Sequence, residues 1–383
     1  MRIAIDYKSA LPERVGIGRY THNLVKSLSQ LDHVNEYLLF CFFLKDYDKK
    51  LSGAPIPSAA NFGLMSAPIP VRITRFCANR FHIPIEGLIG RHDVVHFPEP
   101  YPFRAHRAKI VVTVHDIAFE RFPDLFTKEI LNLYQKQMKM VTARADALIT
   151  VSQTTKDDLI KIYGLDEDRI YVVQHGVEES FKSVKGSATL TEMRQKYNLP
   201  EEFVLHVGTI EPRKNQVRLI QAFQLMSERL PNGPSLVICG KKGWMCDEVF
   251  DTARRSRLRG KILFTGYVGD HDLPYLYKLA RAVAYPSLYE GFGLPVIEAM
   301  ACGRPVLTSN RAAMAEVACD AALLVNPEDV EEIADGLYNL ISDRELRKRL
   351  VVSGLRRASS FTWERAAKST LAVYEKTVKG EVF

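Results

Sequence analysis

Short apolar runs alternate with amphipathic stretches along the whole chain. In the first half they lie at Arg2–Asp6, Tyr37–Phe43, Asp93–Phe97, Ile110–Val114, Ala147–Val151 and Ile170–Val173. In the second half they lie at Phe203–Val207, Ser235–Cys239, Ile262–Thr265, Ala282–Tyr285, Pro305–Thr308 and Ala322–Val325. Strands that alternate with helices build parallel sheets. The pattern therefore predicts an α/β protein with two doubly wound, Rossmann-like parallel-sheet domains.

The same pattern predicts where the domains begin and end. Residues 178–190 are rich in Ser, Gly and Thr and poor in large apolar side chains, which is typical of a linker. We therefore expect an N-terminal domain over 1–180 and a C-terminal domain over 191–361. Residues 362–383 predict a helix that no strand follows, and we expect this helix to pack back on the N-terminal domain.

Composition supports a soluble globular chain. With 383 residues, 46% apolar and 25% charged, the chain exceeds the size at which single cores usually stop growing. Its densest apolar run, Tyr37–Leu44, is shorter than the roughly 20 residues of a membrane-spanning helix. The chain begins directly on a predicted strand, without the pattern of a signal peptide, so we expect a cytoplasmic protein. Its scattered cysteines predict reduced, buried thiols.

The net charge of +7 is modest for this length and does not indicate nucleic acid. Cations do gather between Arg72 and Lys109, where seven Lys or Arg face three acidic residues. Such an excess is compatible with peripheral contact with an anionic membrane. The alternative is an ordinary solvated surface.

The most informative segment joins the predicted strand Ala282–Tyr285 to a predicted helix of about two turns that begins near Pro295. Gly291 and Gly293 remove side chains where strand meets helix, so that an anion can approach the backbone N–H groups and the helix dipole. Glu290 and Glu298 lie on either side of this helix N-terminus, and each carboxylate can accept two hydroxyl hydrogens of a sugar. Taken alone, Glu298 could merely complement the helix dipole, and Glu290 could be a solvated loop residue.

A second segment, 204–215, ends a predicted strand at Gly208 and places Arg213 and Lys214 in the loop that follows. Ligands of open α/β sheets bind at the carboxyl ends of strands. Arg213 can form two hydrogen bonds to phosphate oxygens, and Lys214 is a compact charge. Together they would stabilise the negative charge that develops on a leaving diphosphate. The alternative is a surface Arg-Lys pair.

Two further candidates lie in the first half. Gly16 and Gly18 follow the first predicted strand and open a helix, a weak dinucleotide signal because no third glycine follows. Gly16 would let the backbone approach a phosphate or an acceptor. His115 follows the predicted strand Ile110–Val114 directly, where a side chain can enter a cleft, although a histidine is more often structural than catalytic.

At these residues the chain resembles glycosyltransferase family 4, the retaining enzymes of the GT-B fold, over nearly its whole length. The most specific mark is the E-x7-E element from Glu290 to Glu298. The likeness continues through Gly266-Tyr-Val268, Ala301-Cys-Gly-Arg-Pro305 and Phe361-Thr-Trp-Glu-Arg365. Within the family the chain most resembles bacterial mannosyltransferases of surface-polysaccharide assembly. The resemblance implies two Rossmann-like domains that face an interdomain cleft.

The resemblance also implies a role for each candidate. Glu298 would bind ribose hydroxyls, and Glu290 the hydroxyls of the transferred sugar. Arg213 and Lys214 would neutralise the diphosphate, helped by backbone N–H groups next to Gly291, at Phe292, Gly293 and Leu294. His115 would contact the sugar near its reacting carbon, Gly16 would approach the phosphate or acceptor, and the Tyr267–Val268 backbone would meet the base. Relatives often carry arginine where this chain has Thr209, which places more of the charge neutralisation on Arg213 and Lys214.

These features favour a retaining hexosyltransferase that moves mannose from GDP-mannose to a glycan or lipid-linked glycan. Such an enzyme needs no metal and no bound cofactor, because cationic side chains and helix dipoles supply the electrostatic stabilisation. Three alternatives remain at this point. They are a UDP-sugar-dependent glucosyl- or N-acetylglucosaminyltransferase, a non-catalytic glycan-binding or assembly protein, and an NAD-dependent oxidoreductase.

Overall fold

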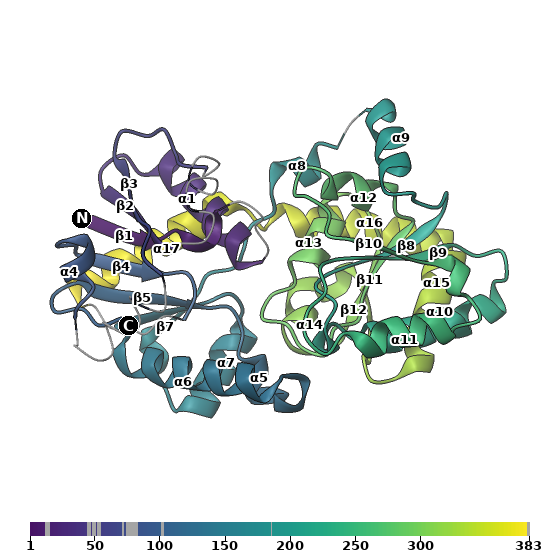
Figure 1. The fold of residues 1–383 in the computed structure, drawn as a ribbon. Coiled ribbons are helices and arrows are strands. Elements are labelled where there is room, and N and C mark those ends of the chain that lie inside the picture. The colour runs from purple at the N-terminus through teal and green to yellow at the C-terminus, as the bar shows by residue number, and fades with distance from the viewer. Residues whose placement is uncertain are drawn as a thin grey trace. The chain divides into compact units, whose positions relative to one another are not determined.

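The computed structural model describes residues 1–11, 16–43, 47, 51, 55–70, 73, 83–100, 103–184 and 186–380. It divides into two compact units (Figure 1). The first unit contains 1–121, 129–176 and 362–383, and the second contains 122–128 and 177–361. Each unit is built on one parallel sheet.

The first unit has a seven-stranded sheet in the order β3-β2-β1-β4-β5-β6-β7, and every pair is parallel. Its central strands β4, β5 and β6 are buried on both faces, as their nearly continuous apolar sequences require. The chain reverses its direction across the sheet between β1 and β4. The strands are β1 (Arg2–Asp6), β2 (Glu36–Phe42), β3 (Phe62–Ala67), β4 (Val94–Phe97), β5 (Lys109–Val114), β6 (Ala147–Thr150) and β7 (Ile170–Val172).

The helices of the first unit include one from the far end of the chain. Helix α17 packs against α1 (Figure 1). Its Trp363, Ala367 and Tyr374 lie in the same apolar core as the side chains of β1. Thr362 caps α17 by accepting a hydrogen bond from the Arg365 N–H. The helices are α1 (Ile17–Leu31), α4 (Glu86–Ile89), α5 (Ala118–Arg121), α6 (Lys128–Arg144), α7 (Gln153–Tyr163) and α17 (Trp363–Lys379).

The second unit has a six-stranded parallel sheet in the order β10-β9-β8-β11-β12-β13. The chain moves outward from β8 to β10, returns to the sheet centre at β11 and moves outward again in the opposite direction. The strands are β8 (Phe203–Val207), β9 (Ser235–Cys239), β10 (Ile262–Gly266), β11 (Ala282–Tyr285), β12 (Val306–Ser309) and β13 (Leu323–Val325). Since parallel crossovers are right-handed, helices that follow β8 and β9 cover one face and those that follow β11 and β12 cover the other.

Several helices of the second unit form its apolar core with the sheet. Helices α10, α11 and α15 contribute buried side chains that share an apolar core with those of β8, β9 and β11. The three helices are labelled in Figure 1. The helices are α8 (Glu179–Lys182), α9 (Ser187–Lys196), α10 (Gln216–Arg229), α11 (Asp247–Arg255), α12 (Leu273–Leu279), α13 (Leu294–Ala301), α14 (Ala312–Ala318), α15 (Val330–Ser342) and α16 (Arg344–Ser359).

The architecture confirms the prediction of two Rossmann-like parallel-sheet units, but details differ from the sequence-based expectation. The edge strand β3 was not predicted. The expected linker 178–190 contains α8 and the first residues of α9, and the division between units falls after Gly176 rather than after 180. Residues 122–128, expected in the N-terminal domain, pack in the second unit. There Phe126 stacks on Trp244, and the Trp244 indole N–H donates to the Leu125 carbonyl at 2.8 Å.

Two surface expectations have mixed outcomes. In the described part of the chain Cys41, Cys239 and Cys302 are buried, as expected, but Cys246 is half-buried and Cys319 is exposed, so the expectation of buried thiols is wrong for these two. In the basic stretch, Arg72, Arg75 and Arg80 lie outside the described residues. Among the residues that are described, no helix combines the length and apolar character needed to cross a membrane.

Candidate active site

The candidate site of the second unit lies where its two central strands end. Strands β8 and β11 are parallel neighbours, with Val204 opposite Ala282 and Leu205 opposite Val283. The loops that follow them therefore leave the same edge of the sheet. This edge is also the point where the strand order reverses, which is the usual ligand position in open α/β sheets.

The loop after β11 leads into α13 as the sequence predicted. Gly293 caps the helix with a φ of +102°, a left-handed conformation that favours glycine. Pro295 occupies the first turn, where its missing N–H costs nothing. A Cβ on Gly293 would lie 2.1 Å from Met314 Cε, so the end of that flexible side chain would have to move. The positive end of α13 consequently faces the loop that carries Glu290.

The loop after β8 is joined to the β11 loop by hydrogen bonds. Residues Pro212–Lys214 form a short 3-10 helix, and Asn215 then adopts a left-handed φ of +61°. The Asn215 amide donates to the carbonyls of Pro286, at 2.9 Å, and Pro327, at 2.6 Å. The Leu288 N–H donates to the Arg213 carbonyl at 3.0 Å. These bonds hold the two loops in a common frame.

Arg213 lies between two carboxylates in this frame. Its Nη1 donates to Glu290 Oε2 at 2.7 Å and to the Tyr289 carbonyl at 3.0 Å. Its Nη2 donates to Glu211 Oε1 at 2.9 Å. The Arg213 side chain is 12% exposed, compared with 3% for Glu211 and 9% for Glu290. The guanidinium is therefore held almost out of solvent by charged partners.

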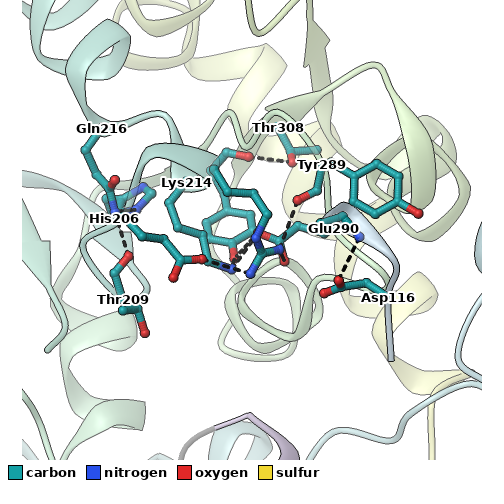
Figure 2. Close-up of polar contacts among 12 residues, drawn as sticks. Asp116, His206, Thr209, Lys214, Gln216, Tyr289, Glu290 and Thr308 are labelled. Atoms are coloured by element: carbon teal, nitrogen blue, oxygen red, sulfur yellow. Dashed lines mark hydrogen bonds and ion pairs between the residues drawn. The ribbon is translucent and has the colours of Figure 1, made fainter. Parts of the chain in front are cut away.

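Lys214 completes the cluster from the next position. Its Nζ donates to Glu290 Oε1 at 2.6 Å and to the Tyr285 hydroxyl at 2.9 Å. The Tyr285 hydroxyl in turn donates to Glu290 Oε1 at 3.0 Å. Figure 2 shows Lys214 and Glu290 reaching toward each other from the two loops. We call Glu211, Arg213, Lys214, Tyr285 and Glu290 the charged cluster.

The two carboxyl groups of the charged cluster have opposite pKa shifts. Burial alone would raise the pKa of Glu290, but the charges of Arg213 and Lys214 and the hydrogen bonds from Lys214 and Tyr285 hold it at about 2. Burial raises the pKa of Glu211, and the nearby Glu290 charge adds to this, against the opposing influence of Arg213 and Lys214. Glu290 is thus a permanent hydrogen-bond acceptor, whereas Glu211 is the group closer to taking up a proton.

A neutral histidine, His206, packs against the charged cluster through Tyr285. His206 Nδ1 lies 2.9 Å from the Ala284 carbonyl, which can only accept, and Gln216 Nε2 lies 3.2 Å from His206 Nε2. Both ring nitrogens are thereby used by the neutral form, and burial lowers the pKa of His206 to about 4. The ring stacks on Tyr285 with centroids 5.5 Å apart. Thr308, also drawn in Figure 2, donates to the Tyr285 carbonyl at 2.8 Å.

Glu298 has neighbours of its own in the second turn of α13. Its residue is 1% exposed, and its Oε2 accepts a hydrogen bond at 3.0 Å from the hydroxyl of Tyr277 in α12. The structure therefore joins Glu290 to Arg213 and Lys214, as part of one cluster, and places Glu298 beside α12.

The remaining candidates of the second unit lie in the loop before α13 and after β10. Phe292 is buried, and its ring meets that of Phe361 edge-on with centroids 5.6 Å apart. Gly291 precedes Phe292, and Leu294 is the first residue of α13. Tyr267 follows β10, and Lys241 Nζ lies 4.4 Å from its ring centroid, while Val268 is 4% exposed. Their predicted ligand contacts stay predictions.

In the first unit, His115 directly follows β5, as expected. Its Nε2 lies 2.9 Å from the Pro98 carbonyl, which assigns the proton to Nε2 in the neutral ring. Burial lowers the pKa of His115, against the opposing influence of that carbonyl and of the Asp116 and Glu99 carboxylates. Its ring contacts Tyr20 edge-on at 4.8 Å. His115 is thus neutral near pH 7, with Nδ1 as its acceptor. Gly16 caps α1 with a φ of +40°.

Two protein-family models match the chain. The model "Glycosyl transferases group 1" matches residues 190–356, and "Glycosyltransferase Family 4" matches residues 15–181. The chain is 33% identical to O-antigen chain mannosyltransferase B of Escherichia coli, over 94% of this chain and 96% of that protein. The chain belongs to glycosyltransferase family 4. The enzyme alternative of an oxidoreductase and the alternative of a non-catalytic protein are therefore set aside.

Solved structures show the same fold at low sequence identity. A sucrose-phosphate synthase from Thermosynechococcus elongatus superimposes with a TM-score of 0.78 at 19% identity, covering 100% of both chains. Anabaena HepE, solved in complex with UDP and glucose, gives a TM-score of 0.75 at 18% identity, covering 98% of this chain and 100% of that chain. This glycosyltransferase therefore has the GT-B architecture of two Rossmann-like units.

Sequence reasoning missed Glu211 and Tyr285 in this glycosyltransferase. Glu211 lies two residues before Arg213 in the same loop, and Tyr285 is the last residue of β11, so their positions were a usable signal. Their burial and their bonds to the cations come from tertiary packing. Among the described residues, no group of three or more His, Cys, Asp or Glu side chains could hold a metal ion.

Glu298 of this glycosyltransferase can be tested by substitution. If Glu298 binds ribose hydroxyls as predicted, we expect Glu298→Ala to weaken binding of a nucleotide-sugar by about 1–3 kcal/mol, because charge-assisted hydrogen bonds would be lost. Isothermal titration calorimetry measures this loss. Tyr277→Phe is the matched control, because it removes the Tyr277 hydroxyl and keeps the Glu298 carboxylate. Equal donor affinity in the wild type and Glu298→Ala would contradict the ribose assignment.

Proposed function

We propose that this glycosyltransferase moves mannose from GDP-mannose, with retention of anomeric configuration, to a glycan or lipid-linked glycan acceptor in the assembly of a surface polysaccharide such as lipopolysaccharide. The observation that carries the proposal is the charged cluster at the strand switch point, in a chain that shares 33% identity with an O-antigen chain mannosyltransferase. The similar O-antigen chain mannosyltransferase RfbU of Salmonella typhimurium, 31% identical over 60% of each chain, supports the same acceptor class.

The geometry supports a separate role for each residue of the site. Arg213 and Lys214 neutralise the donor diphosphate, together with the backbone N–H groups at the start of α13. Glu290 is ionised at every working pH, so that it accepts hydrogen bonds from the hydroxyls of the transferred sugar. Glu298 accepts hydrogen bonds from the ribose. The Tyr267–Val268 backbone meets the base, His115 contacts the sugar near its reacting carbon, and Gly16 approaches the phosphate or the acceptor.

The reaction then depends on charge that develops as the glycosidic bond to phosphate breaks. The leaving diphosphate gains negative charge, which the Arg213 guanidinium and the Lys214 ammonium stabilise. The acceptor hydroxyl attacks from the same face and gives its proton to the leaving phosphate. These groups supply the electrostatic stabilisation by themselves, so we propose that the enzyme uses neither a metal nor a bound cofactor.

The proposed acceptor also bears on the location of the enzyme in the cell. A lipid-linked acceptor lies at the inner face of the cytoplasmic membrane. We therefore propose a cytoplasmic enzyme that contacts anionic lipid peripherally. The exposed Arg91, Arg104 and Arg107 belong to the basic stretch that motivates this contact. Cosedimentation with anionic vesicles that is unchanged when these arginines are replaced by glutamate would argue against it.

A donor panel tests the proposed function directly. A ligand that binds only the folded state raises the melting temperature. We expect GDP-mannose to raise it more than UDP-, dTDP- or ADP-sugars at the same concentration, and to support transfer to a lipid-linked glycan. A larger shift with UDP-glucose or UDP-N-acetylglucosamine would favour the UDP-sugar alternative. Stabilisation by none of the nucleotide-sugars would overturn the proposed function.

A further inference from the structure

Glu211 is the carboxylate of the charged cluster that no proposed step uses. It is 2% exposed and accepts the 2.9 Å hydrogen bond from Arg213 Nη2. Glu290 accepts hydrogen bonds from Arg213, Lys214 and Tyr285. Both carboxylates therefore accept a hydrogen bond from Arg213, but Glu290 also accepts one from Lys214.

The charge balance of the cluster changes when a donor arrives. With both carboxylates ionised, Glu211 and Glu290 balance Arg213 and Lys214. A nucleotide-sugar diphosphate carries two negative charges and approaches the same two cations. In a buried site this excess of negative charge is costly unless one carboxylate becomes neutral.

We propose that Glu211 takes up a proton from bulk solvent when a nucleotide-sugar diphosphate occupies the Arg213–Lys214 pair, so that donor binding is coupled to protonation. This inference rests on the proposed donor site. Once Glu211 is neutral, its ion pair with Arg213 is lost, and the Arg213 Nη2 group can donate to the diphosphate instead. The neutral carboxyl also has an O–H that can donate to a phosphate oxygen.

The groups around Glu211 favour this assignment over other proton acceptors. Glu290 is held ionised by its cations and by Tyr285. His206 uses both ring nitrogens in its neutral form. Burial already raises the pKa of Glu211, which favours its neutral form.

The two lysines of the loop after β9, Lys241 and Lys242, do not counteract the raised pKa of Glu211. The loop after β9 pairs with Glu211's own loop, since the Ile210 N–H donates to the Lys241 carbonyl at 2.8 Å. The ammonium of Lys241 lies over the Tyr267 ring at 4.4 Å, and that of Lys242 over the Phe250 ring at 4.7 Å. These cations therefore lie at aromatic rings, and the charges facing Glu211 are those of Arg213, Lys214 and Glu290.

The sign of the pH dependence follows from the uptake. Because the donor complex holds more protons than the free enzyme, donor binding strengthens as pH falls. Between the pKa of Glu211 in the free enzyme and its pKa in the complex, Kd rises up to about tenfold for each pH unit of increase. Outside that window Kd is independent of this group.

The experiment is calorimetric titration of the full chain with GDP-mannose and UDP-glucose in two buffers of different ionisation enthalpy, over about pH 5.5–8.5. Nucleotide-sugars are the right probes because their diphosphates have no phosphate group that titrates in this range. We expect uptake that approaches one proton per donor in the wild type and in the control Glu345→Gln, an exposed carboxylate in α16. We expect no uptake in Glu211→Gln, which binds donor with a pH-independent Kd.

Each result has one meaning. Donor binding by the wild type without proton uptake overturns the inference and leaves the donor site intact. Uptake that persists in Glu211→Gln also overturns it, because the proton then goes to another group. Failure of the wild type to bind any nucleotide-sugar overturns the proposed function and the inference with it. If Glu211→Gln does not fold, infrared difference spectra of the wild type decide the question, since donor binding must produce the band of a protonated carboxyl group.

Discussion

Replacing Lys214 with methionine is expected to reduce sugar transfer by about 100- to 1,000-fold, the usual cost of removing one donor that stabilises charge in a transition state. Methionine keeps most of the length of the side chain but removes the ammonium that contacts Glu290 Oε1 at 2.6 Å and the Tyr285 hydroxyl at 2.9 Å. The same change leaves a buried carboxylate with one cation fewer. We expect the free energy of unfolding to fall by about 3–5 kcal/mol. Initial-rate kinetics and urea unfolding measure the two effects.

A second variant separates the two losses. In Lys214→Met/Glu290→Gln both members of the buried ion pair are neutral, so we expect much of the stability to return while transfer stays low. Lys348→Met is the control, because its exposed ion pair with Glu345 contributes little. If the double variant regained transfer together with stability, the role of Lys214 would be structural, and its assignment to the diphosphate would fail.

The central strands could be predicted from the sequence because they are buried on both faces. Runs such as Phe203–Val207 and Ala282–Tyr285 are apolar without interruption, which marks strands of a covered parallel sheet. Strand β3 escaped prediction because Phe62–Ala67 contains glycine and serine and is half-exposed over most of its length, as an edge strand can be. The membership of 122–128 in the second unit has no local signal, since it depends on contacts with Trp244 and Tyr289 far along the chain.

The sequence could predict at which strand ends the site residues lie, but it could not predict which side chains contact each other. Parallel strands place their carboxyl ends at one edge, so Arg213, Lys214 and Glu290 could be expected near one another. The ligand contact of these residues stays a prediction, whereas the structure shows that they contact each other. That difference matters, because a cation already held by a carboxylate is oriented before the proposed diphosphate ligand binds. The partner of Glu298, Tyr277 in α12, could not be read from spacing.

Replacing Gly176 with alanine is expected to destabilise the first unit by about 3 kcal/mol or more. A Cβ at this position would lie 2.1 Å from the backbone nitrogen of Trp363 and 2.5 Å from the carbonyl carbon of Thr362. A backbone cannot rotate out of the way as a side chain can, so the overpacking cost has no cheap relief. Urea unfolding of the full chain measures the loss, and Gly260→Ala is the control, because a Cβ there meets nothing within 4 Å.

The reason that this glycine matters is the position of the last helix. Thr362 caps α17, and Trp363, Ala367 and Tyr374 bring that helix into the core of the first unit. Displacing the Thr362–Trp363 backbone disturbs the cap and moves the Trp363 ring away from His175, whose ring centroid lies 5.7 Å from it. With Trp244→Phe as background, Trp363 is the remaining tryptophan, and its fluorescence reports this displacement. A Gly176→Ala variant as stable as Gly260→Ala, with unchanged Trp363 emission, would show that α17 does not pack against this glycine.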